Sequence, residues 1–150
     1  MDEKFIDVEK LIASKNPKLL KRLPSFIINY LKKILHQKEI NQILLENKEV
    51  FGADFCVDII KRFNINVVAH GLKNIPTNEG VIFVSNHPLG GMDAMAIVSK
   101  ISPIRDDINF IVNDLLLNLK NLKGMFVGVD KHSNNAKESL QKVNDLFASD

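Results

Sequence analysis

The sequence has a single cysteine, Cys56, and no window that approaches the roughly 18 apolar residues of a membrane-spanning helix. One cysteine excludes an internal disulfide framework and is compatible with a reducing cytosol. We predict that Cys56 lies in the core. The first ten residues, MDEKFIDVEK, have acids where a secretory signal would have basic residues and an apolar run. Any membrane contact is therefore expected to be peripheral.

Overall composition says little about function. A length of 150 residues fits one domain, or one domain with a helical extension, and 45% apolar with 25% charged residues is ordinary for a globular protein. The net charge of +2 gives no reason to expect a nucleic-acid partner. Function must therefore be inferred from local patterns.

Acidic residues are absent from Lys10 to Lys38, where the chain has eight Lys or Arg residues. Apolar residues recur in this segment at helical spacing, and Pro24 is expected to kink or split the helix. Basic residues with Leu, Phe and Tyr on the other face are typical of a helix that lies on an anionic lipid surface. A helix that covers a core and has a solvated basic face shows the same pattern, so both interpretations stay open.

Helical patterns continue to about residue 63 and then give way to alternating strands and helices. Later helices are predicted over 92–101 and 114–122. Strands are predicted within four apolar runs, 65–72, 81–85, 108–112 and 124–129. This alternation implies an α/β fold, with a largely parallel or mixed sheet and helices on both of its faces. We expect a helical region at 1–63, a candidate for membrane contact, and an α/β region at 64–150.

The stretch SNHPLGGMD, residues 85–93, lies between a predicted strand and the following helix, where sites collect in such sheets. His87 is suited to accept a proton near neutral pH, because imidazole has a reference pKa of about 6.5. Asp93 is placed to hold one imidazole nitrogen and to stabilise the imidazolium. Gly90 and Gly91 permit a tight turn and aim backbone N–H groups at an oxyanion or a phosphate. The pattern predicts His87 as a catalytic base and Asp93 as its orienting acid.

Asn86, His87 and Asp93 on a strand-to-helix turn resemble the first sequence block of the glycerolipid, or lysophospholipid, acyltransferase family. The common form has four residues between His and Asp, whereas this chain has five. The version with His-Pro, a Gly pair and a later Asp is similar to a bacterial branch, often labelled hemolysin-like, that includes acyltransferases for amino-acid-containing lipids. The resemblance implies that a lysolipid hydroxyl attacks the thioester of acyl-CoA or acyl carrier protein directly, with no covalent acyl-enzyme and no cofactor.

The second block of this family is a strand that ends in an aromatic residue, followed three positions later by an Arg that holds the acceptor's phosphate. Gly128 and Lys131 occupy these two positions here. Lys lacks the bidentate fork of Arg, so an amino-acid lipid is expected as acceptor before lysophosphatidic acid. The residues expected to bind substrate are thus Asn86, Gly90, Gly91 and Lys131. The alternative for Lys131 is an ordinary solvated charge.

The third block of the family, a Pro-Glu-Gly-Thr type run, does not occur in the 150 residues. We therefore expect either a piece of a longer protein or a shortened relative, and little acyl transfer from these residues alone. The alternative function is a non-catalytic lipid-surface binding module or an inactive fragment.

Several partners follow from the resemblance. They are the acyl donor, the lysolipid acceptor and the inner face of the cytoplasmic membrane, on which a cytoplasmic protein would bind peripherally. A sheet that lacks its next strand has an open edge, so a second copy of the chain is a further expected partner. No nucleic acid is expected. No metal is expected either, because His36, His70 and His132 show no ligand spacing with one another or with Cys56.

Overall fold

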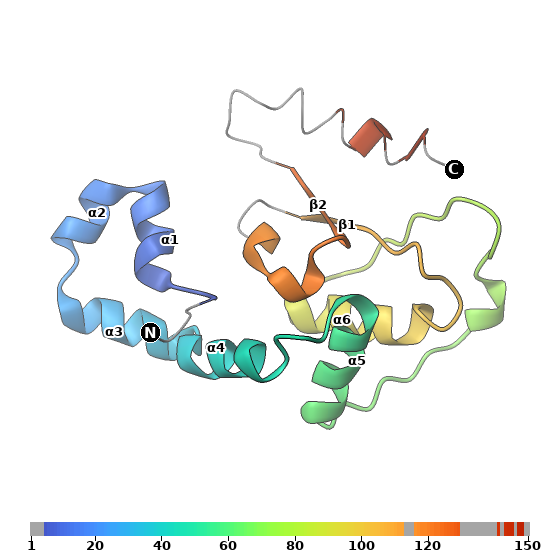
Figure 1. The fold of residues 1–150 in the computed structure, drawn as a ribbon, viewed down its shortest axis with the longest axis horizontal. Coiled ribbons are helices and arrows are strands. Elements are labelled where there is room, and N and C mark those ends of the chain that lie inside the picture. The colour runs from blue at the N-terminus through green and yellow to red at the C-terminus, as the bar shows by residue number, and fades with distance from the viewer. Residues whose placement is uncertain (1–4, 113–115, 130–140, 142, 146, 149–150) are drawn as a thin grey trace. The chain divides into compact units, whose positions relative to one another are not determined.

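In the computed structural model (Figure 1), the described residues are 5–112, 116–129, 141, 143–145 and 147–148. The chain divides into two compact units, Met1–Glu49 and Val50–Asp150. Helices make up the described part of the first unit, whereas the second combines helices with a small parallel sheet. The predicted α/β class is thereby confirmed.

The helices of the first unit begin and end where a side chain accepts hydrogen bonds from free backbone N–H groups or where a proline interrupts the helix. Their bounds are α1 Val8–Lys15, α2 Pro17–Arg22, α3 Ser25–Ile34 and α4 Gln37–Glu46. Asp7 caps α1 by accepting hydrogen bonds from two N–H groups of its first turn. Asn16 ends α1 and caps α2 by accepting the N–H of Leu19 at 3.0 Å. Pro24 separates α2 from α3, as predicted, because its ring cannot continue a helix.

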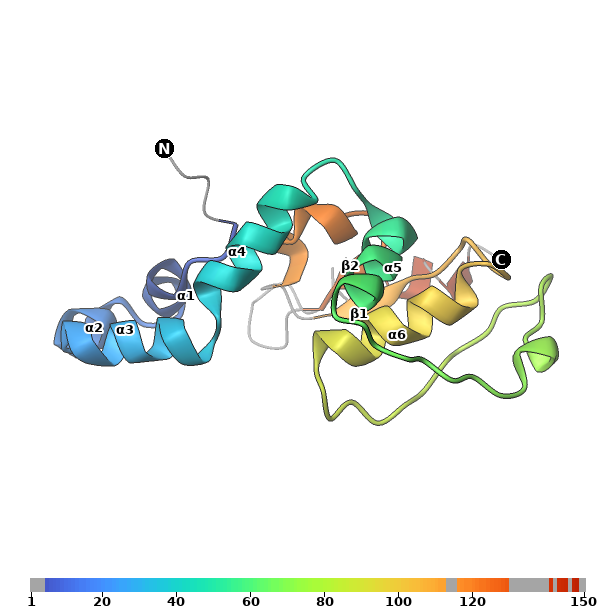
Figure 2. The same cartoon turned by 90° about the horizontal axis from the view of Figure 1, so that it is seen from below.

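Polar side chains of α4 hold the beginning of the chain within the first unit. Buried Gln37 accepts a hydrogen bond from the Val8 N–H, with 2.8 Å between this nitrogen and Oε1. The amide of Asn41 pairs with both backbone groups of Ile6, at 2.7 Å each. Among the described residues of this unit, the buried apolar ones are Val8 and Leu44, and α1 lies against α2 and α3 (Figure 2). The polar contacts hold the start of α1 against α4.

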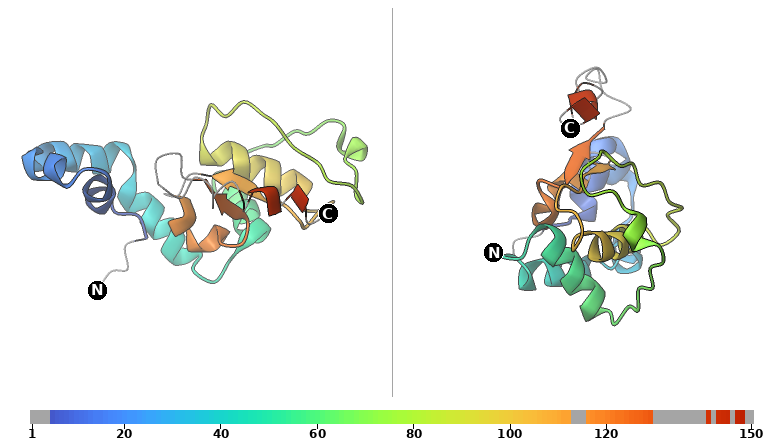
Figure 3. Two further views of the ribbon diagram at one scale, coloured as in Figure 1. Left: turned by 90° about the horizontal axis from the view of Figure 1, so that it is seen from above. Right: turned by 90° about the vertical axis from the view of Figure 1, so that its right-hand side faces the viewer.

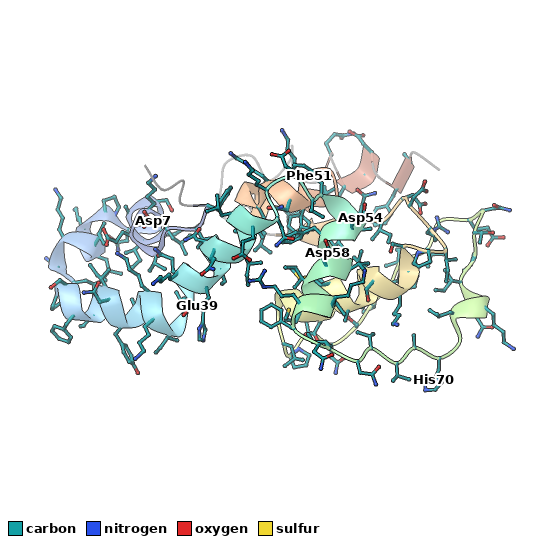
Figure 4. All side chains as sticks on the ribbon, turned by 60° about the horizontal axis from the view of Figure 1, so that its bottom comes forward. Asp7, Glu39, Phe51, Asp54, Asp58 and His70 are labelled. Atoms are coloured by element: carbon teal, nitrogen blue, oxygen red, sulfur yellow. The ribbon has the colours of Figure 1, made fainter. Side chains whose placement is uncertain are left out.

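Two helices supply most of the core of the second unit, α5 (Gly52–Arg62) and α6 (Gly91–Ile101), which pack against each other. Their buried side chains are Phe55, Cys56, Ile59, Ile60, Val98 and Ile101. Asp54 and Asp58 lie on the exposed face of α5 (Figure 4). Burial raises the pKa of the Cys56 thiol to about 11, and the predicted core position of this residue is confirmed.

The sheet of the second unit consists, within the described residues, of two parallel strands, β1 (Phe110–Val112) and β2 (Phe126–Gly128). Phe110 lies opposite Phe126 in the register. Their rings meet edge to face, with centroids 6.3 Å apart, which is a favourable aromatic geometry. The two strands predicted within 108–112 and 124–129 are therefore present and parallel.

The crossover between β1 and β2 differs from the prediction. It has two short 3-10 turns, η2 (Leu116–Asn118) and η3 (Lys120–Leu122), where a helix is predicted over 114–122. Residues 114 and 115 of the predicted helix lie outside the described residues, and its described part, 116–122, contains these two turns and no regular helix. Buried Asn121 donates from Nδ2 to the Val50 carbonyl at 2.8 Å and so fixes the crossover near the start of α5.

Residues 64–90 form a long open loop that has one 3-10 turn, η1 (Leu72–Asn74), as Figures 1 and 3 show. The prediction of strands within 65–72 and 81–85 is wrong, because neither segment pairs with another described segment. No backbone group of 81–87 hydrogen-bonds to another described residue. A strand needs a neighbour for its N–H and C=O groups, and the described strands pair only with each other.

Candidate active site

The stretch SNHPLGGMD ends the open loop and begins α6. Residues 88–90 form a turn, and the Asp93 N–H donates to the Gly90 carbonyl at 3.1 Å. Gly90 precedes α6 with φ 64° and ψ −134°, a conformation that glycine alone adopts readily. A Cβ at Gly90 would meet no atom within 4 Å, so backbone conformation and not crowding requires the glycine.

This turn brings His87 and Asp93 together. Nδ1 of His87 lies 3.5 Å from Oδ2 of Asp93, which is longer than an ordinary hydrogen bond and within the range of an ion pair. Hydrogen bonds between catalytic groups are often long before substrate binds and shorten in the complex. The backbone N–H of Leu89 donates to the same Oδ2 at 2.7 Å. The carboxylate is therefore held by the turn that separates it from His87.

The two side chains differ in their access to solvent. The side chain of His87 is 60% exposed, whereas that of Asp93 is 18% exposed. With Nδ1 beside the carboxylate, Nε2 is the nitrogen left to exchange a proton with a substrate, and it has no partner among the described residues. A carboxylate beside Nδ1 keeps the proton on that nitrogen and stabilises the imidazolium that forms when Nε2 accepts another. The arrangement suits general-base chemistry.

The beginning of α6 offers hydrogen-bond donors next to this pair. The N–H groups of Gly91 and Met92 donate to no other described residue, and no side chain caps the helix. A Cβ built at Gly91 would meet nothing within 4 Å. The positive end of a helix dipole favours negative charge. Backbone N–H groups without a described acceptor, and space beside Gly91, therefore lie at the turn where the sequence predicts contact with an oxyanion or a phosphate.

The remaining predicted site residues are Asn86 and Lys131. Asn86 is exposed and hydrogen-bonds to no other described residue. Lys131 lies outside the described residues. The structure therefore gathers His87, Asp93 and the two glycines around one turn, with Asn86 adjacent in the chain.

Sequence reasoning misses Arg105, whose guanidinium holds the loop that leads to the site. Nη1 donates to the carbonyls of Pro76 and Glu79 at 2.6 Å each, and these residues lie 29 and 26 positions earlier. The guanidinium also pairs with the carboxylate of Asp107, and this bond lowers the pKa of that carboxyl. The Arg105 side chain is 10% exposed. No spacing signal connects residues so far apart.

A metal-binding cluster and a membrane-spanning helix are both absent from the described residues. No three His, Cys, Asp or Glu side chains gather there as they would around a metal ion. His70 lies exposed on the open loop (Figure 4), and His36 lies at the start of α4 in the other unit. In that part of the chain, no helix combines the length and the apolar content that crossing a bilayer requires.

Comparison with known proteins gives two similar relatives, both named lyso-glycine lipid O-acyltransferase. The protein from Bacteroides thetaiotaomicron is 40% identical over 147 residues, which cover 97% of this chain and 54% of the relative. The protein from Phocaeicola vulgatus is 36% identical over 147 residues, which cover 97% of this chain and 53% of the relative. The chain thus spans about half the length of these curated relatives. No solved structure matches it.

A family model described as acyltransferase matches residues 10–150, which is nearly the whole chain. This range includes the turn with His87 and Asp93 and both described units in large part. The match agrees with the resemblance that the sequence block around His87 indicates. The chain belongs to the acyltransferase family.

Proposed function

We propose that this chain is the part of a lysolipid O-acyltransferase that supplies the general base. The transferred group is a fatty acyl chain, and the acceptor is a lysolipid hydroxyl. Lyso-glycine lipid is the first candidate because both relatives are named for it. The observation that carries the proposal is the 3.5 Å approach of His87 Nδ1 to the anchored carboxylate of Asp93. This approach leaves Nε2 of the exposed imidazole ring to take the proton from the lysolipid hydroxyl group.

In the proposed reaction, Nε2 of His87 removes the proton of the acceptor hydroxyl as the oxygen attacks the carbonyl carbon of an acyl thioester. Asp93 stabilises the imidazolium that forms. The oxyanion of the tetrahedral intermediate meets the N–H groups of Gly91 and Met92 at the positive end of α6. The C–S bond then breaks, and the imidazolium returns its proton to the leaving thiolate. The products are an ester and a free thiol, with no covalent acyl-enzyme.

The donor and the acceptor follow from the same family resemblance. The donor is an acyl thioester, carried either by CoA or by acyl carrier protein. For the acceptor, Lys131 stands where the second family block has Arg, and a lysine meets phosphate as a point charge without a bidentate fork. This favours an amino-acid head group over lysophosphatidic acid.

The test is acyl transfer by the protein as its gene encodes it. The donors are acyl-CoA and acyl carrier protein, and the acceptors are lyso-glycine lipid and lysophosphatidic acid. His87→Ala is expected to lower kcat/KM at least ~100-fold, because a positioned base contributes roughly 100- to 10,000-fold. Its circular dichroism spectrum should stay unchanged.

His70→Ala is the matched control, since His70 is an exposed histidine of the same loop and has no bond to His87 or Asp93. This variant should keep the full rate. Near-normal turnover by His87→Ala would refute the role of His87. If the unaltered protein binds lipid vesicles and transfers no acyl group to either acceptor, the alternative of a non-catalytic lipid-binding module replaces the proposal.

A further inference from the structure

One side of helix α3 is apolar and exposed to solvent. Phe26, Tyr30 and Ile34 are 70%, 63% and 52% exposed, and their spacing of four residues places them on one side of the helix. Ile27 and Leu31 are half-buried, as expected for the side that packs within the unit. Large apolar residues aligned in the open indicate a contact surface. We call the side formed by Phe26, Tyr30 and Ile34 the α3 face.

The buried residues and the long-range polar bonds described for the first unit do not include the α3 face. The buried apolar residues described in this unit are Val8 and Leu44. The long-range polar bonds described in it run from Gln37 and Asn41 of α4 to the backbone at the start of α1, and from Lys32 of α3 to Glu9 of α1. None of these contacts uses a residue of the α3 face, so these three side chains are free to meet another surface.

The segment that contains the α3 face has basic charge only, since no acid occurs from Lys10 to Lys38. Within it, Lys33 is exposed and pairs with no described acid, whereas its neighbour Lys32 is paired with Glu9 of α1. The preceding helix, α2, adds three exposed basic side chains without described ion-pair partners, Lys18, Lys21 and Arg22. Such a surface complements a negatively charged one.

We propose that the α3 face binds an anionic lipid surface. Phe26 and Ile34 bury apolar surface at the boundary between head groups and acyl chains, where Tyr30 can also keep its hydroxyl among the head groups. The unpaired basic side chains of α2 and α3 meet the lipid phosphates. A second copy of the chain suits the face poorly, because it would bring two basic segments together. This binding goes beyond the proposed acyl transfer and uses no residue of the catalytic turn.

Tyr30 provides a direct readout, because it is the only tyrosine and the chain has no tryptophan. Vesicles of equal parts phosphatidylglycerol and phosphatidylcholine should protect its emission from a water-soluble quencher. Vesicles of phosphatidylcholine alone should protect it less. Added salt should restore quenching, because charge attraction at a surface is screened over about 10 Å at 0.1 M. The His87→Ala chain should bind like the unaltered chain, which separates this result from any result on catalysis.

Two sets of variants test the α3 face itself. Phe26→Ser combined with Ile34→Ser keeps Tyr30 as reporter and should weaken vesicle binding at least ~10-fold. Leu45→Ser is the matched control, since Leu45 is 54% exposed on α4 of the same unit, and it should bind as before. Lys33→Gln should weaken binding about fivefold. Lys32→Gln removes the same charge, yet should weaken it less, because Lys32 is already paired with Glu9.

Three results would overturn the proposal, provided that circular dichroism shows folded variants. The first is equal vesicle binding by the Phe26→Ser, Ile34→Ser variant and the unaltered chain. The second is a dimer that this double variant abolishes in sedimentation experiments, because a second copy would then cover the α3 face. The third is equal weakening by Lys32→Gln and Lys33→Gln, since total charge and not the α3 face would then control binding.

Discussion

Leu89 and Asp93 are joined by a 2.7 Å hydrogen bond in which the backbone N–H of Leu89 donates to Oδ2 of Asp93. The same oxygen lies 3.5 Å from Nδ1 of His87. The turn and the imidazole therefore share one carboxylate. Because the two roles use different chemistry, substitutions of Asp93 should separate them.

Asp93→Asn keeps an oxygen that can accept a hydrogen bond from the Leu89 N–H, whereas its neutral amide lacks the negative charge that stabilises the imidazolium of His87. We expect kcat/KM to fall ~100-fold or more, with little change in Tm, because the imidazole loses its orienting carboxylate. Asp93→Ala should also lose about 1 kcal/mol of stability with the hydrogen bond to Leu89. Acyl-transfer assays and calorimetry measure the two effects. Equal losses of stability in both variants would contradict the shared role of the carboxylate.

Gly90→Ala and Gly91→Ala form a matched pair in the same turn. At Gly90, φ is 64° and ψ is −134°, so alanine should cost about 1 to 3 kcal/mol of unfolding free energy. Gly91 is helical with open space around it, so alanine should be neutral or stabilise by up to about 1 kcal/mol. Urea unfolding measures both. Equal stability of the two variants would show that the turn does not need the conformation at Gly90.

The pair of Arg105 and Asp107 predicts a pH dependence of stability. The bond from Arg105 lowers the pKa of Asp107 below its unfolded value of about 3.9. The ion pair therefore contributes stability above pH ~3.9, and this contribution is lost as the pH falls through the lower pKa that Asp107 has in the folded state. Asp107→Asn should lower Tm at pH 7 and leave it unchanged in strong acid. The effect should be small, since the carboxylate is 51% exposed.

The control for this pair is Asp58→Asn, which removes an exposed acid from the middle of α5. It should change Tm less than Asp107→Asn at pH 7. A difference between Asp107→Asn and the unaltered chain that persists in strong acid would contradict the ion-pair explanation.

The open segment at 81–87 predicts self-association of the 150-residue chain. Ile82 and Val84 are 71% and 90% exposed, and the backbone beside them has no described partner. Unpaired apolar segments of this kind bind other chains through their free N–H and C=O groups. Ile82→Lys with Val84→Lys should therefore lower the average mass in analytical ultracentrifugation. Leu45→Lys, on an exposed residue of α4, should not. A monomeric unaltered chain would disprove this prediction.

Local patterns predict those features that depend on neighbours in the chain. Pro24 separates two helices because the effect of proline is local. His87 and Asp93 lie close because a single turn joins them, and the spacing around the glycines is enough to indicate it. The core position of Cys56 follows from the apolar side of one helix. These features need no knowledge of the rest of the fold.

Features that depend on distant residues are not predictable in the same way. Residues 81–85 have the composition of a strand, but strand formation requires a partner that composition does not reveal. Arg105 binds carbonyls 29 and 26 positions earlier, and nothing in its own neighbourhood indicates this. The described part of the crossover, 116–122, has the apolar residues of a helix, yet it contains two short turns, and Asn121 in the second of them is bonded to Val50, 71 positions earlier.

In the proposed reaction, the base His87 is 60% exposed and therefore also meets water. Water has an O–H group that Nε2 of His87 can deprotonate, and closure of an active site is what normally keeps water from a reactive acyl group. A thioester at this turn would therefore divide between ester formation and hydrolysis. The division depends on how completely the lipid acceptor, or further protein, shields the imidazole. The ratio of ester to free fatty acid in the products thus measures how well His87 is covered.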